Sequence, residues 1–399
     1  MSKANQYDIV IIGGGIMGSA IAYYCAKKGR RVLVIERRDQ ASGSAGATDG
    51  VVGFHTKKPG LQMELAVRSI ALFPSLSEEL GVDIEYGDRC GGLQPVEDQE
   101  QWELMEAMSS QQRASGVDIR MIGIDEARQI EPQLSPKLLG ALYSPTSGKV
   151  NPIFLTFAFA AAAKRLGAVF LNETEVTGIL RDREKVLGVK TARAECPADQ
   201  VVIAAGSWSA PVAEMAGVSI PIKPRKGQIV ITEQIGHFMT TTVQCARYNM
   251  IKFRPESITD ETILRTGSSL SIEQTEDGAM VIGCTREFAG YDTENTLEGV
   301  EMIVRRAAQF FPALKDIHVI RTFAGLRPYT PDGSPLLGEM ESLKGLYVAA
   351  GHEGDGIALA PITGVLMSEL LVDGKTSFPL EPFSPNRFQA AGADGAAVT

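Results

Sequence analysis

A glycine-rich turn between two apolar runs constrains the fold of this chain more than any other feature. Residues 7–12 form an apolar run that leads into a G-x-G-x-x-G motif at residues 13–18. An alanine-rich segment with helical spacing follows, and a second apolar run at residues 31–36 ends in a glutamate. Apolar runs of this kind are typical of strands that are buried on both faces. The order of strand, glycine turn, helix and strand predicts a βαβ unit.

Each glycine of the motif has its own role in such a unit. Gly13 allows a tight turn, Gly15 lets the backbone approach a pyrophosphate, and Gly18 lets the helix pack closely on the strand. The N-terminus of the helix offers unpaired N–H groups and a positive dipole end to the phosphates. Glu36 closes the second strand, where its carboxylate can accept hydrogen bonds from ribose hydroxyls. The unit predicts a dinucleotide site, and a purely structural turn is the alternative.

The loop after Glu36 favours FAD over NAD. Residues 41–50 are small and polar, which suits a segment that lies along a pyrophosphate and a flavin edge, although a flexible surface loop is the alternative. The acidic side chain of Glu36 disfavours the phosphorylated ribose of NADP. An NAD-dependent dehydrogenase would need a catalytic His or Lys that faces the nicotinamide, and the second half of the chain offers no clear candidate.

The bulk composition limits the classes of partner and site. A chain of 399 residues favours two intertwined domains over one core. The net charge is -9 and no basic cluster stands out, so nucleic acid and anionic membranes are poor partners. We expect no signal peptide and no transmembrane run of about 20 apolar residues, which predicts a cytoplasmic protein. Five scattered cysteines without a CxxC spacing and four unclustered histidines predict no metal site.

The remaining periodicities predict a mixed α/β fold. Helices are expected at residues 61–82, 99–115, 151–166, 296–311 and 357–373, and strands at residues 168–171, 186–190, 200–205 and 345–350. Short segments rich in β-branched residues between 220 and 286 indicate a mixed or antiparallel sheet. We expect a Rossmann-type FAD-binding domain at residues 1–85, 145–220 and 325–388, an inserted substrate-binding domain at 86–144 and 221–324, and a disordered tail at 389–399.

Beyond the βαβ unit and the polar loop, four later stretches of the chain resemble the D-amino-acid oxidase and glycine oxidase family of flavoenzymes. They are Gly148-Lys149-Val150-Asn151-Pro152, residues 199–208 ending in Ala-Ala-Gly-Ser-Trp, residues 325–333 beginning with Gly-Leu-Arg-Pro-Tyr, and residues 345–352 ending in Ala-Ala-Gly-His. The resemblance covers residues 7–388. Residues 351–361 are most similar to one branch, which holds the catalytic subunits of bacterial opine oxidases, hydroxyproline dehydrogenases and heteromeric proline dehydrogenases.

The resemblance implies an FAD-dependent enzyme that oxidises the C–N bond of a small substrate. The substrate would be a D-amino acid, glycine or sarcosine, proline or hydroxyproline, or an opine. A hydride would pass from its α-carbon to flavin N5, and water would hydrolyse the resulting imine. The branch implies a catalytic subunit of a heteromeric dehydrogenase, with smaller partner subunits that carry further redox centres. The alternatives are a stand-alone glycine- or sarcosine-type oxidase that produces hydrogen peroxide, and a flavin-binding subunit without turnover.

The resemblance also implies that Arg327, in a Gly-x-Arg-Pro sequence, binds the substrate carboxylate. A guanidinium fork matches a carboxylate with two hydrogen bonds and stays charged at any relevant pH. A structural ion pair is the alternative for Arg327. Tyr248, His352 and, more weakly, Lys252 are further candidates for the substrate side of the flavin. No general base stands out.

Four side chains have both a functional and a purely structural interpretation, and the sequence leaves the choice open. His55 and His352 either line the flavin or are core histidines. Glu353 and Asp355 either meet a cationic group of the substrate or face solvent. Ala350 is followed by Gly351 and His352 and by no cysteine, which favours non-covalent FAD.

The residues expected to contact FAD come from the glycine turn, the polar loop and the ends of later strands. They are Gly13, Gly15, Ile16, Met17, Gly18, Glu36, Arg37, Ser44, Ala45, Thr48, Gly50, Val51, Val176, Ala205, Gly206, Trp208, Arg327, Gly351, Gly354, Asp355, Gly356 and Ile357. Those that follow residue 350 precede a helix, so that backbone N–H groups there can face negative charge that develops on the flavin.

Overall fold

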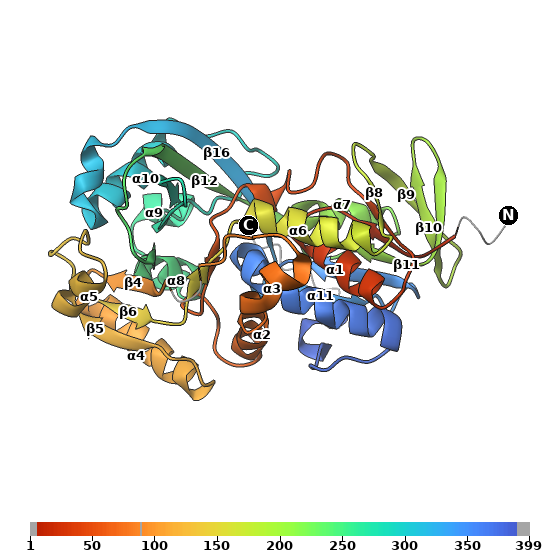
Figure 1. The fold of residues 1–399 in the computed structure, drawn as a ribbon, viewed down its shortest axis with the longest axis horizontal. Coiled ribbons are helices and arrows are strands. Elements are labelled where there is room, and N and C mark those ends of the chain that lie inside the picture. Colours follow the sequence, from red (N-terminus) through yellow and green to blue (C-terminus); the bar gives the residue numbers. More distant parts are fainter. Residues whose placement is uncertain (1–5, 88–89, 389–399) are drawn as a thin grey trace.

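The computed structural model describes residues 6–87 and 90–388, which build two large sheets that lie side by side (Figure 1). The chain passes from the first sheet to the second and back twice, so each sheet collects strands from distant parts of the sequence. This arrangement confirms the mixed α/β fold. The domain boundaries stay a prediction, and one long strand, β16 (Val319–Tyr329), runs across the expected boundary at residue 325. The tail expected at residues 389–399 lies outside the described residues.

The first sheet has a parallel centre. Its strand order is β17, β18, β11, β1, β2 and β8, with β10 attached to β11 and β9 to β10. The strands are β1 (Tyr7–Ile12), β2 (Val32–Ile35), β8 (Val169–Leu171), β9 (Val176–Arg181), β10 (Val186–Thr191), β11 (Glu195–Ile203), β17 (Leu336–Glu339) and β18 (Leu346–Ala350). From β18 to β8 every neighbouring pair is parallel. Ligands of such sheets bind outside the carboxyl ends of the strands, where the strand order reverses.

The second sheet is antiparallel except for one pair. Its order is β16, β12, β15, β14, β13, β4, β6 and β5, and only β13 and β4 run parallel among the described residues. The strands are β4 (Gly92–Val96), β5 (Arg120–Gly123), β6 (Gly140–Ser144), β12 (Lys223–Gln234), β13 (Thr242–Gln244), β14 (Ser271–Gln274), β15 (Ala279–Gly283) and β16. A small ladder pairs β3 (Val51–Val52) with β7 (Gly148–Lys149). This confirms the mixed sheet that the β-branched segments indicated.

The helices largely follow the expected periodicities. They are α1 (Ile16–Lys27), α2 (Leu61–Ile70), α3 (Phe73–Leu80), α4 (Gln99–Ala114), α5 (Ile124–Ile130), α6 (Pro152–Arg165), α7 (Ser209–Glu214), α8 (Ala246–Phe253), α9 (Glu261–Thr266), α10 (Leu297–Phe310) and α11 (Gly356–Asp373). The single helix expected at 61–82 is two helices, because Pro74 lacks the N–H that a continuous helix needs and instead sits in the first turn of α3. The segment expected to be sheet contains α8 and α9, which are too short to show a helical period.

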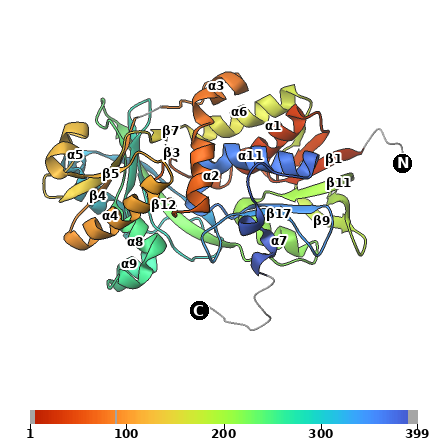
Figure 2. The ribbon, with the colours of Figure 1, turned by 90° about the horizontal axis from the view of Figure 1, so that it is seen from below.

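Both faces of strand β1 are buried, which explains its continuous apolar run. Ile9 and Ile11 belong to a core that they share with α1, α6 and α11. Val10 and Ile12 point the other way, into a second core with β9, β10 and α7. Figure 2 shows α1, α6 and α11 gathered on one side of the first sheet. A strand with helices and a small antiparallel layer on its two faces needs apolar residues at every position.

Helix α11 is apolar all round because it is a core helix. The segment Glu353–Asp373 is long and apolar enough, by length and composition, to cross a membrane, which corrects the expectation that no stretch of the chain reaches that length. In the structure 72% of its most apolar window is buried, against α1 and α2 among others. A helix without a polar face is typical of the centre of a large core as well as of a membrane. The cytoplasmic location stays a prediction.

The third glycine of the motif controls how α1 sits on β1. A Cβ at Gly18 would lie 1.9 Å from the carbonyl oxygen of Gly13, so a side chain there pushes the helix off the turn. A Cβ at Gly15 would meet no atom within 4 Å.

We therefore expect Gly18→Ala to lower the free energy of unfolding of the protein by about 1–3 kcal/mol, the usual cost of overpacking a core. Gly15→Ala, the matched control, should change the stability of the cofactor-free protein by only a few tenths of a kcal/mol, since it replaces an N-terminal helix cap without a clash. Urea unfolding of both variants without cofactor measures the difference. Equal stabilities of the two variants would contradict this account of Gly18.

Candidate functional site

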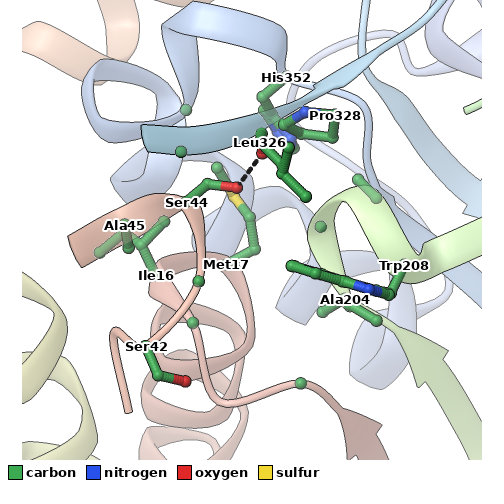
Figure 3. A pocket seen from close by; sticks show the side chains of 18 of the residues that line it. Ile16, Met17, Ser42, Ser44, Ala45, Ala204, Trp208, Leu326, Pro328 and His352 are labelled. Carbon is green, nitrogen blue, oxygen red and sulfur yellow. Dashed lines mark hydrogen bonds between the residues drawn. The ribbon is translucent and has the colours of Figure 1, made fainter. Parts of the chain in front are cut away.

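A cavity of about 300 Å³ lies where the carboxyl ends of β1, β2, β11 and β18 meet the end of β16 (Figure 3). It extends from Glu36 and Val176 at one end to Arg327 and Gly354 beside the second sheet. Of the expected cofactor contacts, the lining includes Gly13, Gly15, Ile16, Met17, Glu36, Arg37, Ser44, Ala45, Thr48, Val51, Val176, Ala205, Gly206, Trp208, Arg327, Gly354, Gly356 and Ile357. His352 also lines it.

Four expected cofactor contacts and one catalytic candidate do not line the cavity. Gly18 and Gly50 face other backbone, because a Cβ would lie 1.9 Å from the Gly13 carbonyl oxygen in one case and 1.8 Å from the Val150 carbonyl oxygen in the other. Gly351 turns the chain with a φ of +83° at the end of β18. The remaining two, Asp355 and Tyr248, are buried behind the lining residues.

One end of the cavity is built around the carboxylate of Glu36. This carboxylate accepts hydrogen bonds from the N–H of Gly14 at 2.8 Å and of Arg38 at 2.9 Å, which fixes its position at the end of β2. Trp208 also lines the cavity, with the guanidinium carbon of Arg37 4.0 Å from its ring centroid and the ring of Tyr291 stacked at 5.7 Å. An aromatic wall and an anchored carboxylate are suited to an adenosine.

The sequence patterns missed one wall of the cavity. Pro211, Val212 and Met215 line it from α7 and the turn after this helix. A helix of six residues carries too little periodicity to be recognised, and its lining residues are ordinary apolar ones. The strand-end residues Ala349 and Ala350 belong to one of the stretches that resemble the family, and their small size leaves room for a ligand at the end of β18.

The polar loop and the end of β11 are tied to β16 at one point. The carbonyl oxygen of Leu326 accepts a hydrogen bond from the hydroxyl of Ser44 at 2.5 Å (Figure 3). It also accepts one from the hydroxyl of Ser207 at 2.8 Å. Gly325 lies against the polar loop as well, because a Cβ there would be 2.5 Å from the carbonyl oxygen of Ala47. These contacts fix where the next residue of β16, Arg327, enters the cavity.

The guanidinium of Arg327 lies over the neighbouring strand. A Cβ at Gly227 would be 2.0 Å from Nη1 of Arg327, so the side chain occupies the space that a larger residue on β12 would fill. Nη1 donates a hydrogen bond to the carbonyl oxygen of Thr285 at 3.0 Å. The structural ion pair considered as an alternative is not formed with any described carboxylate. Burial opposes the charged form, while nearby Cys284 and Tyr248 favour it and raise the pKa of Arg327.

A carboxylate, Glu353, sits among several arginines at the edge of the cavity. It pairs with Nη2 of Arg286, lies 3.7 Å from Nη1 of Arg225, and accepts the N–H of Gly354 at 2.8 Å. Burial alone would raise the pKa of Glu353, but the cations around it, Arg286 foremost, hold it at about 2. Arg286 also stacks on Tyr248, with its guanidinium carbon 4.5 Å from the ring centroid. Glu353 is therefore ionised and buried, which excludes the solvent-facing alternative.

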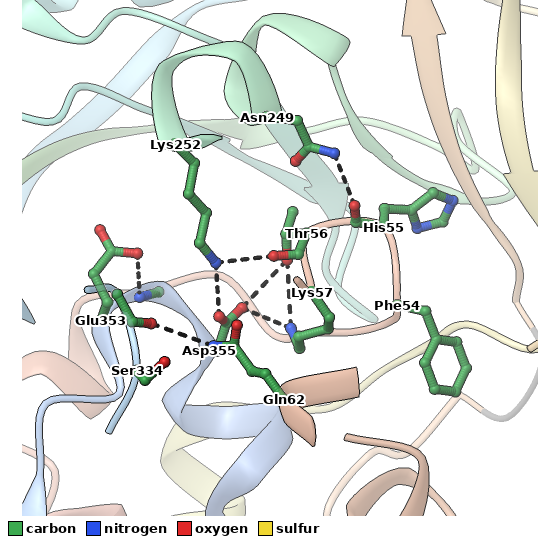
Figure 4. A network of polar contacts seen from close by, with 12 residues as sticks. Phe54, His55, Thr56, Lys57, Gln62, Asn249, Lys252, Ser334, Glu353 and Asp355 are labelled. Carbon is green, nitrogen blue, oxygen red and sulfur yellow. Dashed lines mark hydrogen bonds and ion pairs between the residues drawn. The ribbon is translucent and has the colours of Figure 1, made fainter. Parts of the chain in front are cut away.

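The second carboxylate, Asp355, is buried between two lysines (Figure 4). Its Oδ1 accepts a hydrogen bond from Nζ of Lys57 at 2.6 Å and its Oδ2 from Nζ of Lys252 at 2.7 Å. Lys252 also donates to the carbonyl oxygen of Thr56 at 2.9 Å. Burial would raise the pKa of Asp355, but the two ammonium groups hold it far below its usual range. The solvent-facing alternative is excluded here too, and Lys252 serves this network.

The two histidines differ in position. His352 lines the cavity and its Nε2 lies 3.0 Å from the hydroxyl of Thr363. His55 is buried in the neighbourhood of Gly92 and is not among the residues that line the cavity. Burial lowers the pKa of both to about 4, so both are neutral near pH 7. In the described part of the chain no group of three His, Cys, Asp or Glu side chains is placed to hold a metal ion.

The residues around the cavity fit FAD. Helix α1 begins at the open position of Gly15, and α11 begins at Gly356, so two helix N-termini direct N–H groups and positive dipole ends toward the cavity. The first suits a pyrophosphate in the middle of an elongated ligand, and the second suits a ring that gains negative charge near Arg327. None of the described lining residues is a cysteine.

Comparison with known proteins agrees with this geometry. Residues 8–370 match the family model described as FAD dependent oxidoreductase (DAO). A glycine oxidase of Geobacillus kaustophilus is 32% identical over 96% of this chain and 97% of the relative. The hydrogen cyanide synthase subunit HcnC of Pseudomonas aeruginosa is 31% identical over 96% of each. The solved structure of an L-proline dehydrogenase from P. horikoshii is 32% identical with a TM-score of 0.87, covering 97% of this chain and 99% of that one.

The lysine-flanked carboxylate makes a prediction about stability. Asp355→Asn keeps a side chain of the same shape and a residue that caps helices well, but leaves two buried ammonium groups without a counter-charge. We expect it to lower the free energy of unfolding by about 3–5 kcal/mol, as when a buried pair loses one partner. The matched control is Asp373→Asn, which breaks an exposed pair with Lys28 and should cost less than about 1 kcal/mol. Urea denaturation decides, and a similar loss in both variants would refute the prediction.

Proposed function

The chain belongs to the FAD dependent oxidoreductase (DAO) family, and from this premise we propose that Arg327 binds the carboxylate of a small amino-acid substrate. The enzyme is FAD-dependent, of the glycine oxidase type, and acts on the C–N bond of amino acids. We also propose that FAD is held non-covalently and that the segments 86–144 and 221–324 form the substrate domain.

One observation carries the assignment to Arg327. Its side chain is partly buried, lines the cavity and makes only one hydrogen bond within the described residues, from Nη1 to a backbone carbonyl. A partly buried guanidinium with unused donors favours an anion, and a carboxylate fits its fork. A flavin-binding subunit without turnover would have no use for such a group at this place.

The residues around Arg327 suit an amine that must react in its neutral form. The α-carbon loses a hydrogen together with two electrons and the nitrogen loses a proton, so the C–N single bond becomes an imine. Water then hydrolyses the imine to an oxo compound and an amine. Bound FAD supplies the oxidising power for this step. The excess of cations near Arg327 disfavours an ammonium group on the substrate, as does desolvation in the cavity. Tyr248, whose pKa is raised by burial, stays protonated there.

We further propose that the protein works as the catalytic subunit of a heteromeric dehydrogenase. Two relatives favour this: one is a subunit of hydrogen cyanide synthase by name, and another is an L-proline dehydrogenase. A stand-alone oxidase that forms hydrogen peroxide is the second candidate, and the similarity to glycine oxidases favours it. The two candidates differ in how fast oxygen reoxidises the reduced protein.

Anaerobic flavin reduction tests the proposal directly. The purified protein should be yellow, and its absorbance should bleach with one class among glycine, sarcosine, D-amino acids, L-proline, hydroxyproline isomers and opines. Slow reoxidation on admitting air would indicate a protein acceptor, and fast reoxidation with hydrogen peroxide would indicate a stand-alone oxidase. A protein that binds FAD but is reduced by none of these amines would contradict the proposed function.

The carboxylate role of Arg327 makes a sharper prediction. Arg327→Ala should slow flavin reduction by the preferred amino acid about 100-fold, or roughly 2.7 kcal/mol, because the substrate carboxylate loses a charge-assisted contact. Arg327→Lys, which keeps the charge but not the fork, should lie between this variant and the wild type. Stopped-flow absorbance gives the rates, and reduction by dithionite shows that FAD remains bound and reducible. If Arg327→Ala is reduced by substrate at the wild-type rate, the assignment is wrong.

A further inference from the structure

Two arginines face each other across neighbouring strands of the second sheet. In the antiparallel pair of β12 and β16, Arg225 is the direct partner of Arg327. Residues paired in this way point to the same face of the sheet, with Cβ atoms roughly 5 Å apart, and like charges so placed destabilise it. The protein therefore keeps two guanidinium groups together at a cost in stability. Arg327 lines the cavity, and Arg225 lies 3.7 Å from Glu353, which lines it too.

The side chain of Arg225 is fixed in place but its hydrogen-bond donors are not used. Its guanidinium carbon lies 5.1 Å from the ring centroid of Phe288 and 5.2 Å from that of Tyr329. Its Nε is buried without a hydrogen-bond partner, and its only ion pair within the described residues is the 3.7 Å approach to Glu353. Stacking on rings leaves the N–H groups in the plane of a guanidinium free to bind an anion.

Glu353 does not explain why Arg225 is there. That carboxylate already pairs with Arg286 and accepts the N–H of Gly354. At 3.7 Å the contact from Arg225 is longer than a hydrogen bond. Three guanidinium groups, of Arg225, Arg286 and Arg327, thus surround a single carboxylate and leave two positive charges in excess. One substrate carboxylate on Arg327 would balance only one of them.

The surroundings of Arg286 point the same way. Its side chain is fully buried, and its Nε and Nη1 have no hydrogen-bond partner in the described part of the chain. Buried polar atoms are nearly always satisfied, so an unsatisfied pair next to a ligand cavity favours an anion or an ordered polar group there. Arg286 also stacks on Tyr248, the residue whose hydroxyl would be 2.7 Å from a Cβ at the cavity residue Gly354.

We propose that the substrate is a dicarboxylic amine, an amino acid whose nitrogen or side chain bears a second carboxylate, and that Arg225 binds this second carboxylate with Arg286 behind it. The inference rests on the proposed function, since it takes Arg327 to hold the first carboxylate. The rings of Phe288, which is 59% exposed, and Tyr329 pack on the guanidinium of Arg225 and would lie on either side of the second carboxylate. Two carboxylates balance the two excess guanidinium charges.

A pair of achiral amines tests the proposal. Sarcosine and iminodiacetate differ only in that a carboxylate replaces one hydrogen of the N-methyl group. With the FAD-bound protein, the second-order rate constant of anaerobic flavin reduction should be at least about 10-fold higher for iminodiacetate. Arg225→Gln should reduce this preference about 10-fold to 100-fold, the effect of one charge-assisted contact. Arg321→Gln, which removes an exposed arginine from the neighbouring strand β16, should keep the wild-type preference. A wild-type protein without the preference, or an Arg225→Gln variant that retains it, would overturn the proposal.

A binding measurement separates this inference from the proposed function. Malonate and acetate are titrated into the FAD-bound protein and followed by the change in flavin absorbance. Malonate should bind at least about 10-fold tighter than acetate in the wild type and Arg321→Gln, and the two should bind alike in Arg225→Gln. This result would support the subsite even if no amine reduced the flavin and the proposed function failed. Equal binding of malonate and acetate by the wild type would refute the subsite, whatever the turnover.

Discussion

The hydrogen bonds to the carbonyl oxygen of Leu326 join the parts of this protein that must act together. Ser44 belongs to the loop after the nucleotide-binding unit, Ser207 follows the central strand β11, and Leu326 lies on the long strand β16 of the second sheet. Because both hydroxyls donate to the same oxygen, the polar loop and the segment after β11 are fixed in position relative to β16. A shift of β16 would move Arg327 away from the cavity, since backbone position sets where a buried guanidinium can reach.

The start of α11 adds a second constraint, which is electrostatic. Its first turn follows Glu353 and Asp355, two buried carboxylates placed near the positive end of a helix dipole and among cations from distant segments. Glu353 adopts a φ of +51°, which is unfavourable for a residue with a side chain, and its pairing with Arg286 offsets that cost. Lys57 and Lys252 balance Asp355 with one positive charge in excess. The substrate end of the cavity is thus positive overall, while its carboxylates serve to hold the cations.

The sequence predicts features formed by residues close together in the chain. It does not predict contacts between side chains that only the pairing of distant strands brings together. The βαβ unit could be recognised because strand, turn, helix and acidic residue fall within residues 7–36, and the cavity contains most of the expected contacts. Arg225 and Arg286 carry no motif, since their closeness to Arg327 follows from the pairing of β12 with β16 and from the turn after β15. The short helices α8 and α7, which bring Tyr248 and Met215 toward the site, are also too brief to show a period.

Two glycines shape the end of the cavity near Arg327, because their lack of a side chain makes room for polar groups of other residues. Gly227 leaves room for the guanidinium of Arg327, and Gly354 leaves room for the hydroxyl of Tyr248, although these four residues lie on four different elements. Any Cβ at either glycine would displace the guanidinium of Arg327 or the hydroxyl of Tyr248. Packing therefore fixes the position of the Arg327 guanidinium. Candidate substrates are then distinguished by how well their own charged groups match the fixed charges of the protein. This favours a substrate chosen by the number and spacing of its carboxylates over one chosen by the shape of an apolar side chain.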